Sequence, residues 1–289
     1  MTETVLVSGA TGNIGTYLIP LLASQTGFVV KAMTRHPDKH RDNFAESVQL
    51  VAGSFEDGAT LRSAMEGVDT VVMIAPPGPD CVRQNQAVIG AAKRSGVKKI
   101  VRISAIKAAE DGRTENTRLH GQCDALLQNS GMTYTILRPN YFMQNIFMSL
   151  DSLKADNCFY AGMGDGKLAM IDVRDVAESA LTAATSDEFD DKILEISGPA
   201  SINFNEVAEV LCDVAGRHIS YVPVSPDDVK ASLLQMGLGE WMANLLKEYS
   251  EAYGDGWGDL VTDNVERLTG HPARSFREFA ADCVAPALT

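Results

Sequence analysis

Short apolar segments alternate with amphipathic segments through the first half of the chain. The apolar segments are rich in valine, isoleucine and threonine, as is typical of strands buried on both faces of a sheet. These predicted strands are Thr4–Ser8, Phe28–Thr34, Val48–Ala52, Thr70–Ala75, Lys99–Ser104 and Thr133–Arg138. The predicted helices between them are Asn13–Ser24, Gly58–Met65, Asp80–Ser95 and Glu115–Asn129.

Strict alternation of strand and helix predicts βαβ units and a parallel sheet with helices on both faces. Gly27, Gly67, Gly96 and Gly131 stand just beyond four of the helical patterns, where a residue in the left-handed conformation commonly ends a helix. The predicted fold class is therefore α/β, a Rossmann-type doubly wound parallel sheet.

The pattern changes after Pro139. The glycine-rich segment Cys158–Gly166 indicates a loop or hairpin, whereas Asp172–Ala184 indicates a helix and Lys192–Ser197 one more strand. Beyond this strand helical patterns dominate, with one further strand predicted at His218–Val224. We predict that residues 1–157 and 172–200 form the Rossmann-type domain and that residues 158–171 and 201–289 form a smaller, mainly helical lobe.

Helix-capping signals mark three helix starts in the last third of the chain. Asn203 and Ser275 are each followed three residues later by glutamate, which is the spacing of a capping box. Ser225 precedes Pro226, and proline suits the first position of a helix.

The composition is that of an ordinary globular protein, with 45% hydrophobic and 22% charged residues. The formal net charge of −13 opposes binding to nucleic acid, which depends on lysine and arginine contacts to phosphates. The five cysteines are scattered without a CxxC pair, so we expect reduced thiols and no metal site. Neither a secretory signal nor a membrane-length apolar stretch is visible. We expect a soluble, cytoplasmic monomer or homodimer without nucleic-acid or membrane partners.

A glycine-rich turn follows the first predicted strand and leads into the first predicted helix. It reads Gly9-Ala10-Thr11-Gly12-Asn13-Ile14-Gly15. The first glycine permits the tight turn, the second lets backbone N–H groups approach a pyrophosphate, and the third lets the helix pack closely on the strand. The helix N-terminus adds unpaired N–H donors and a favourable dipole for the anion. Because the turn lies inside a βαβ unit, it predicts a dinucleotide-binding site.

The residue after the second strand selects between the two nicotinamide dinucleotides. An acid there accepts hydrogen bonds from the ribose 2′-OH of NAD, whereas an arginine accommodates the 2′-phosphate of NADP. The second strand ends at Thr34 and is followed by Arg35, 20 residues beyond Gly15. A guanidinium donates two parallel hydrogen bonds to phosphate. We therefore expect NADP(H) to be preferred over NAD(H), unless Arg35 is an ordinary solvated surface residue.

Further cofactor contacts are expected where the parallel strands end, because ligands of doubly wound sheets lie across the carboxyl ends of the strands. Ala75, Pro76 and Pro77 follow the fourth predicted strand, and Ser104 and Ala105 end and follow the fifth. We expect these residues to line the cofactor site.

Several motifs resemble those of the atypical short-chain dehydrogenase/reductases. They are GATGNIG at the first turn, MTR at the end of the second strand, ILRPNYFMQN around the end of the sixth, IDVRDVAESALTAA and LTGHPARSFREFAADC. They are most similar to the NmrA-like branch, which includes triphenylmethane reductase and the type-2 NAD(P)H quinone oxidoreductases. The resemblance implies that Phe55 lies beside the adenine and that Asn140, Tyr141 and Phe142 lie near the nicotinamide. Ser54 replaces an aspartate that many relatives have.

Ordinary short-chain reductases carry a Tyr-x-x-x-Lys pair on the helix after the fifth strand, where the lysine lowers the tyrosine pKa. The corresponding segment, Glu115–Asn129, contains neither residue type, and His120 and Gln122 occupy the region. An acceptor that needs little proton help is therefore expected, because a quinone that takes hydride becomes a stabilised phenolate and a cationic dye is neutralised. We expect an NADPH-dependent oxidoreductase for a quinone, dye or similar flat aromatic acceptor, in which positioning supplies most of the catalysis.

Three alternatives stay open at this point. The missing pair is also compatible with a non-catalytic NADP(H)-binding redox sensor that acts through a protein partner. His120 is the titratable group expected near the nicotinamide, as a general acid or as a structural residue, and Tyr141 is a second candidate for a catalytic role. Apolar side chains expected near the mouth of the site suit a flat aromatic acceptor but fit an ordinary core equally well. They are Phe142, Met143, Phe147, Met163 and Trp241.

Overall fold

The computed structural model describes residues 2–288, which form two compact units. Unit 1 comprises Met1–Asp111, Thr117–Arg138 and Val176–Leu194. Unit 2 comprises Gly112–Asn116, Pro139–Asp175 and Glu195–Thr289. Within the described part of the chain, no helix has the length and apolar character needed to cross a membrane.

Unit 1 is built on a seven-stranded sheet with the strand order β3-β2-β1-β4-β5-β6-β8. Its strands are β1 (Glu3–Val7), β2 (Phe28–Thr34), β3 (Gln49–Ala52), β4 (Thr70–Met73), β5 (Lys99–Ile103), β6 (Thr133–Pro139) and β8 (Lys192–Ile196). Its helices are α1 (Gly15–Ala23), the 3-10 helix η1 (Pro37–Asn43), α2 (Gly58–Ala64), α3 (Cys81–Ser95), α4 (Glu115–Gln128) and α6 (Val173–Thr185). The elements α4, α6, β6 and β8 each extend by a few residues into unit 2.

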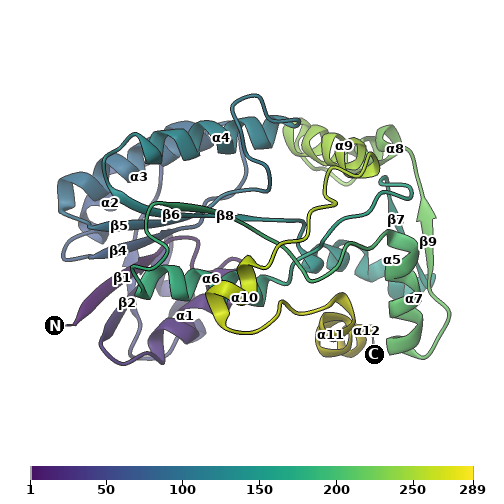
Figure 1. Cartoon of the computed structure of the whole chain (residues 1–289), viewed down its shortest axis with the longest axis horizontal. Coiled ribbons are helices and arrows are strands. Elements are labelled where there is room, and N and C mark those ends of the chain that lie inside the picture. Colours follow the sequence, from purple (N-terminus) through teal and green to yellow (C-terminus); the bar gives the residue numbers. More distant parts are fainter. Residues whose placement is uncertain (1, 289) are drawn as a thin grey trace. The chain divides into compact units, whose positions relative to one another are not determined.

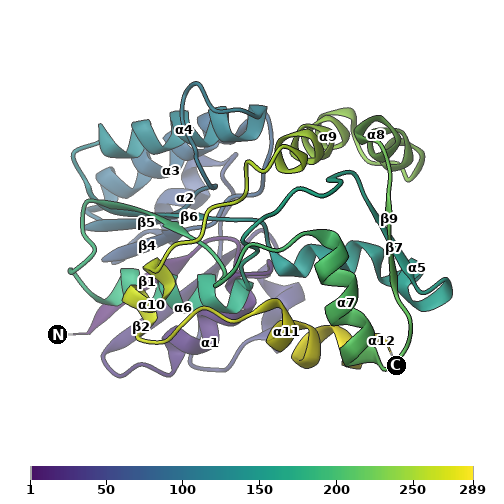
Figure 2. The same cartoon turned by 45° about the vertical axis from the view of Figure 1, so that its right-hand side comes forward.

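The strands from β3 to β6 are joined by parallel pairing throughout. Figures 1 and 2 show α2, α3 and α4 along one face of this sheet and α1 and α6 along the other. A strand covered on both faces must be apolar along its whole length, and every residue of β4 and β5 is indeed buried. The predicted doubly wound α/β fold is confirmed.

The predicted elements of this half are all present, with ends that differ by at most two residues. Gly96 ends α3 with a φ of 75°, as expected for a left-handed cap. The strand order reverses at β1, because β2 lies on one side of it and β4 on the other. Such a reversal opens a crevice at the carboxyl ends of the strands, and the glycine-rich turn lies there.

Unit 2 consists mainly of short helices. They are the 3-10 helix η2 (Met143–Ser149), α5 (Leu150–Ala155), α7 (Phe204–Ala215), α8 (Pro226–Gln235), α9 (Glu240–Gly254), α10 (Asn264–Thr269), α11 (Phe276–Phe279), the π-helix η3 (Ala280–Val284) and α12 (Ala285–Leu288). The three predicted caps are present, since the side chains of Asn203, Ser225 and Ser275 each accept a hydrogen bond from a backbone N–H of the following helix.

A two-stranded sheet in unit 2 corrects one expectation. The segment predicted as a loop or hairpin begins with the strand β7 (Cys158–Ala161), which pairs in parallel with β9 (Ser220–Pro223). The hairpin prediction is therefore wrong for this segment. The partner strand lies about sixty residues further along the chain, so no local turn signal can reveal the pairing.

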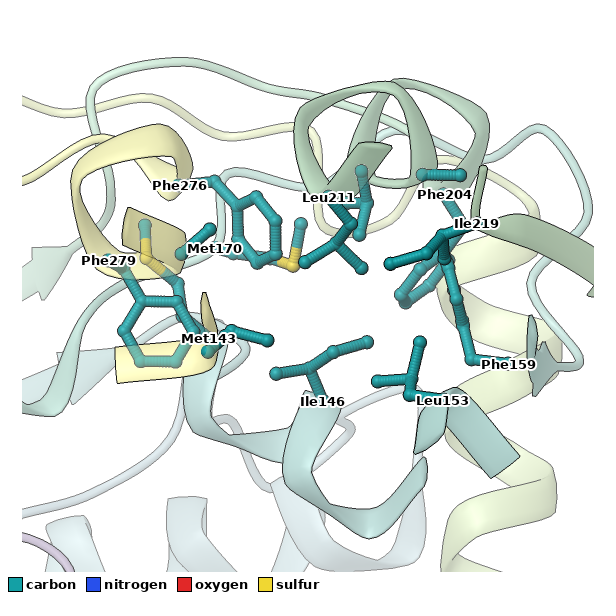
Figure 3. Packing of buried hydrophobic residues seen from close by; sticks show 14 of the residues in the cluster. Met143, Ile146, Leu153, Phe159, Met170, Phe204, Leu211, Ile219, Phe276 and Phe279 are labelled. Atoms are coloured by element: carbon teal, nitrogen blue, oxygen red, sulfur yellow. The ribbon is translucent and has the colours of Figure 1, made fainter. Parts of the chain in front are cut away.

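The core of unit 2 contains a cluster of aliphatic and aromatic side chains (Figure 3). Phe279 is fully buried within it, and its ring centroid lies 5.9 Å from that of Phe147 and 5.8 Å from that of Phe276. Figure 3 shows Met143 and Met170 beside these rings. The short C-terminal helices are therefore held by burial of their aromatic side chains rather than by helix propensity, which is marginal at this length.

We predict that Phe279→Ala lowers the free energy of unfolding by about 3–5 kcal/mol, because it removes a large buried side chain and leaves a cavity. Met148→Ala is the matched control, since Met148 is 60% exposed and its truncation should change the value by less than about 0.5 kcal/mol. Urea titrations followed by circular dichroism measure both. Equal effects of the two substitutions would show that this cluster does not hold the C-terminal helices.

Candidate functional site

The glycine-rich turn between β1 and α1 has the geometry of an anion cradle. Gly9 has a φ of 62°, which favours glycine, and its carbonyl accepts the Gly12 N–H at 3.0 Å. A Cβ on Gly15 would lie 2.4 Å from the Gly9 oxygen, so helix and turn approach as closely as predicted. Within residues 2–288 the exposed N–H groups of Thr11 and Asn13 have no acceptor. They are available to an anion at the helix start.

The segment after β4 lies directly beside this turn. The Ser8 hydroxyl accepts the Ile74 N–H at 2.8 Å and donates to the Ile74 carbonyl at 3.0 Å. A Cβ on Gly9 would lie 3.0 Å from that same carbonyl oxygen. Ala75 is half-buried, and Pro76 and Pro77 are exposed. The structure therefore brings the first turn and the predicted Ala75–Pro77 segment together.

The remaining predicted residues of unit 1 stand at the ends of neighbouring strands. Thr34 ends β2 and is half-buried, and Arg35 follows it with an exposed side chain. Phe55 follows β3 and packs partly against the core of unit 1. Ser104 is buried and Ala105 half-buried after β5. All five lie beyond or at the carboxyl end of a parallel strand, which is the edge that binds ligands in this fold.

Arg35 carries an uncompensated positive charge at this edge. Within the described part of the chain its guanidinium makes no hydrogen bond or ion pair. The neighbouring backbone is ordered by a bond from the His36 N–H to the Thr34 hydroxyl at 3.4 Å. A solvated, unpaired guanidinium can turn toward a phosphate without first breaking a protein contact.

His120 belongs to a buried polar network that sequence reasoning missed. Its Nδ1 lies 3.1 Å from Nη2 of Arg102, a residue inside β5. Arg102 also pairs with Asp124 on α4 and donates from Nε to Asn85 at 2.9 Å. Asp124 further accepts from Nε of Arg138 at 2.9 Å. The available signal was Arg102 itself, because a charged residue inside a buried strand requires a partner.

The pKa of the half-buried His120 lies well below its usual value. Burial of the ring disfavours the charged form, and the positive charges of Arg102 and Arg138 lower the pKa further. The imidazole is therefore neutral near pH 7. This favours the structural interpretation of His120 over that of a general acid.

Asn140, Tyr141 and Phe142 lie in unit 2, directly after β6 in sequence. The Asn140 side chain is buried, donating to the Gly258 carbonyl at 2.9 Å and accepting the Tyr141 N–H at 2.8 Å. Phe142 is half-buried. Asn140 thus fixes the backbone of this segment, and the predicted contact of the three residues with the nicotinamide stays a prediction.

Tyr141 has the character of a neutral aromatic side chain. Its ring meets that of Tyr253 edge-on at a centroid distance of 5.4 Å and that of Phe204 at 6.4 Å. Burial raises its pKa to about 12, against a smaller opposing effect of a hydrogen bond with Asn145. Among residues 2–288 no cationic side chain lowers this pKa as the lysine of a Tyr-x-x-x-Lys pair does, so Tyr141 is not activated for proton transfer.

Most of the apolar side chains considered for an aromatic acceptor have a packing role. Met143 and Met163 are buried members of the core of unit 2, and Phe147 packs against that core. The indole of the half-buried Trp241 donates to Glu115 at 3.0 Å. For Met143, Met163 and Phe147 the core interpretation is the correct one, because an apolar side chain enclosed by its own unit offers little surface to a ligand.

The chain is similar in sequence and fold to proteins that bind NAD(P)H. A family model described as NAD(P)H-binding matches residues 9–187. An NAD(P)H azoreductase from Xenophilus azovorans is 36% identical over 276 residues, which cover 96% of each chain. An NADPH-dependent quinone oxidoreductase from Escherichia coli, crystallised with NADPH, has a TM-score of 0.88 at 26% identity over 97% of this chain and 99% of that one. Triphenylmethane reductase from Citrobacter sp., complexed with NADP(H), shares the fold with a TM-score of 0.83 at 23% identity over 96% and 99%.

The two later glycines of the turn should respond differently to substitution. We predict that Gly12→Val abolishes dinucleotide binding and leaves the fold largely intact, because Gly12 is exposed in the turn where the pyrophosphate is expected and its Cβ would meet only the Gly9 carbonyl oxygen, at 3.3 Å. Gly15→Ala should instead lower the free energy of unfolding by about 1–3 kcal/mol, because the new Cβ overlaps the Gly9 carbonyl.

Gly58→Ala is the control for an added methyl group, since its Cβ would meet only the Arg62 side chain, at 3.8 Å. Circular dichroism, thermal unfolding and a fluorescence titration with NADPH on each sample separate the two effects. Undiminished binding by Gly12→Val would place the dinucleotide elsewhere.

Proposed function

The chain belongs to the NAD(P)H-binding family, and from this premise we propose that it is an NADPH-dependent oxidoreductase that transfers hydride to a quinone, an azo dye or a similar flat aromatic acceptor. The predicted membership of the NmrA-like reductases is confirmed, and relatives named azoreductase and quinone oxidoreductase bear out an NAD(P)H-dependent oxidoreductase. The preference for NADPH and the acceptor class are the parts that we propose.

The residues of the first turn fit a dinucleotide. The close approach of Gly15 to Gly9 leaves the exposed N–H groups of Thr11 and Asn13 at the start of α1, where they can bind a pyrophosphate. Arg35 stands at the end of β2, the position that discriminates the adenosine ribose, and its unpaired guanidinium suits a 2′-phosphate. When bound, the reduced nicotinamide supplies the hydride.

We assign the acceptor class from one observation: neither His120 nor Tyr141, the two candidate proton donors, has a pKa suited to giving a proton near pH 7. His120 is neutral near pH 7 because burial and two arginines lower its pKa, and Tyr141 has a pKa of about 12. A carbonyl reduced to an alkoxide needs a proton from the enzyme. A quinone reduced to a phenolate does not, because the charge is delocalised over the ring and water supplies the proton afterwards. The chain's contribution is then to hold the acceptor against the nicotinamide.

One relative is named an NAD(P)H azoreductase, from Xenophilus azovorans, and we therefore include azo compounds among the proposed acceptors. An azo bond that accepts hydride gives a nitrogen anion conjugated with an aromatic ring, which takes its proton from water in the same way. Quinones and azo dyes are both flat and conjugated. We therefore propose one site for both, which selects its acceptors by their flat shape.

Turnover tests the proposal directly. We expect the protein to oxidise NADPH in the presence of menadione and of a water-soluble azo dye, with no oxidation when an aliphatic ketone is the acceptor. Absorbance at the NADPH band and at the dye band measures both reactants. Tight NADPH binding without oxidation by any acceptor would instead identify a redox sensor, and ketone reduction would contradict the proposed acceptor class.

Arg35 should decide the choice of cofactor. We predict that NADPH binds at least about 10-fold more tightly than NADH, because a charge-assisted bond to phosphate contributes about 1.4 kcal/mol or more. Arg35→Asp should reduce or reverse the preference, since a carboxylate repels the 2′-phosphate and accepts from a 2′-OH.

Arg94→Asp is the matched control on the surface of α3 and should leave the preference unchanged. Fluorescence titrations of each variant with both cofactors give the affinities. Equal affinities of the wild type for NADPH and NADH would contradict the assignment of Arg35.

A further inference from the structure

The contact between His120 and Arg102 determines which ring nitrogen carries the proton. Nδ1 of His120 lies 3.1 Å from Nη2 of Arg102. A guanidinium has only donors, so a hydrogen bond between these atoms requires a lone pair on Nδ1. The neutral imidazole must then carry its proton on Nε2. The contact therefore selects one tautomer of His120 out of two.

Arg102 is itself held in place on every side that the structure describes. Its side chain is 3% exposed, it pairs with Asp124, and its Nε donates to Asn85 at 2.9 Å. Asp124 is 1% exposed and also binds Arg138 at 2.9 Å. Two arginines and one aspartate leave one net positive charge beside His120. The ring thus faces a fixed donor that cannot rotate away, and a second charge from β6 that also disfavours its protonation.

The network lies at the ligand-binding edge of the sheet. Ser104 stands just beyond the carboxyl end of β5 and donates to Asp124 at 3.0 Å. The helix α4 connects the parallel strands β5 and β6 and must run opposite to them. His120 lies four residues before Asp124, one helical turn further toward the carboxyl ends on the same face of α4. His120 is therefore placed beyond the end of β5.

The loop after β5 closes against this part of α4. A Cβ on Gly121 would lie 2.2 Å from the carbonyl carbon of Ala109, and the Ala109 N–H donates to the Thr117 carbonyl at 3.2 Å. The glycine beside His120 thus permits the loop that follows Ser104 and Ala105 to touch the helix. Residues of α4 at this level therefore lie against the loop that leaves the carboxyl end of β5.

We infer that His120 serves the bound reactants as a fixed neutral hydrogen-bond donor through Nε2–H, and that Arg102, Asp124 and Arg138 are the residues that position it. The identity of the reactants rests on the proposed function, whereas the tautomer rests on the network alone. The donor stabilises negative charge that develops on the acceptor or holds the carboxamide of the cofactor, and it keeps its proton throughout. Water then supplies the proton that the reduced acceptor takes up.

The first experiment reads the tautomer without any turnover. Long-range proton–nitrogen correlation spectra of protein labelled with ¹⁵N-histidine distinguish a pyrrole-type Nε2–H from a pyrrole-type Nδ1–H, and the spectrum of His120→Gln assigns the signal. We expect the wild-type ring to show Nε2–H and to remain neutral through the pH range around 6.5, in which an unperturbed imidazole titrates. An Nδ1–H pattern, or titration of this ring near its ordinary pKa, would overturn the inference even in a fully active enzyme.

The second experiment separates a donor from an acid. His120→Gln keeps an N–H within reach of the Nε2 position but has no titratable proton, whereas His120→Ala has neither. As a donor, His120→Gln should retain kcat/KM for menadione within about 3-fold of the wild type, and His120→Ala should lose about 3- to 10-fold, the size of one neutral hydrogen bond. Equal large losses in both variants would identify a general acid, and no loss in either would remove His120 from the site. If no acceptor is turned over, NADPH affinity of the two variants is compared in the same way.

The third experiment tests the positioning residues. Arg102→Gln removes the positive charge and a fixed donor beside His120, so we expect the His120 pKa to rise. The pH profile of kcat/KM, which we expect to be flat in the wild type, should then show a break near pH 6–7. Arg102→Lys keeps the charge and should leave the profile flat, and Arg94→Gln is the surface control. An unchanged His120 pKa in folded Arg102→Gln would contradict the role of Arg102. If this variant does not fold, the wild-type spectrum and the two His120 variants still decide the inference.

Discussion

Burial of the parallel sheet on both faces is the constraint on which the other features of unit 1 depend. The helices on either side exclude water from every residue of β4 and β5, so a polar group there must find a protein partner. Polar groups that have no protein partner are therefore restricted to the ends of the strands, where water or a ligand can reach them. The glycine turn, the segment after β4 and Ser104 are gathered at the carboxyl ends for this reason, and the reversal of strand order at β1 opens the crevice that they share.

Arg102, a charged residue inside β5, departs from this constraint, and its presence there has a chemical consequence. Its charge inside β5 is balanced by Asp124, which in turn joins α4 to β6 through Arg138. Burial lowers the pKa of the adjacent imidazole, and the positive charges of Arg102 and Arg138 lower it further, so the ring is neutral near pH 7. A buried ion pair is weak evidence for stability, but here it fixes both the position and the proton of a ring at the edge of the sheet.

The chemistry that these groups allow is narrow. A neutral histidine and a tyrosine with a pKa of about 12 can orient and stabilise a ligand but are poorly suited to protonating an alkoxide. Conjugated acceptors avoid the requirement because hydride addition gives them a stabilised anion. In unit 2 the residues after β6 serve first to order their own backbone, as the buried Asn140 shows. Single side chains therefore need to contribute little to the rate, and most of the catalysis comes from holding the acceptor against the nicotinamide.

The sequence by itself determined the doubly wound sheet, the glycine turn and the helix caps, because each depends on residues close together in the chain. Short continuous apolar runs locate the buried strands, amphipathic patterns locate the helices, and the Gly9–Gly15 spacing is a local property of one βα unit. Only the tertiary structure decided the pairing of β7 with β9 and the contact of His120 with Arg102. Those features join residues distant in sequence: Arg102, Asp124 and Arg138 come from three elements, and His120 contacts Arg102 at the point where they meet. Burial also decided that Met143 and Met163 belong to a core, because an apolar residue has the same local pattern whether it faces a ligand or its own unit.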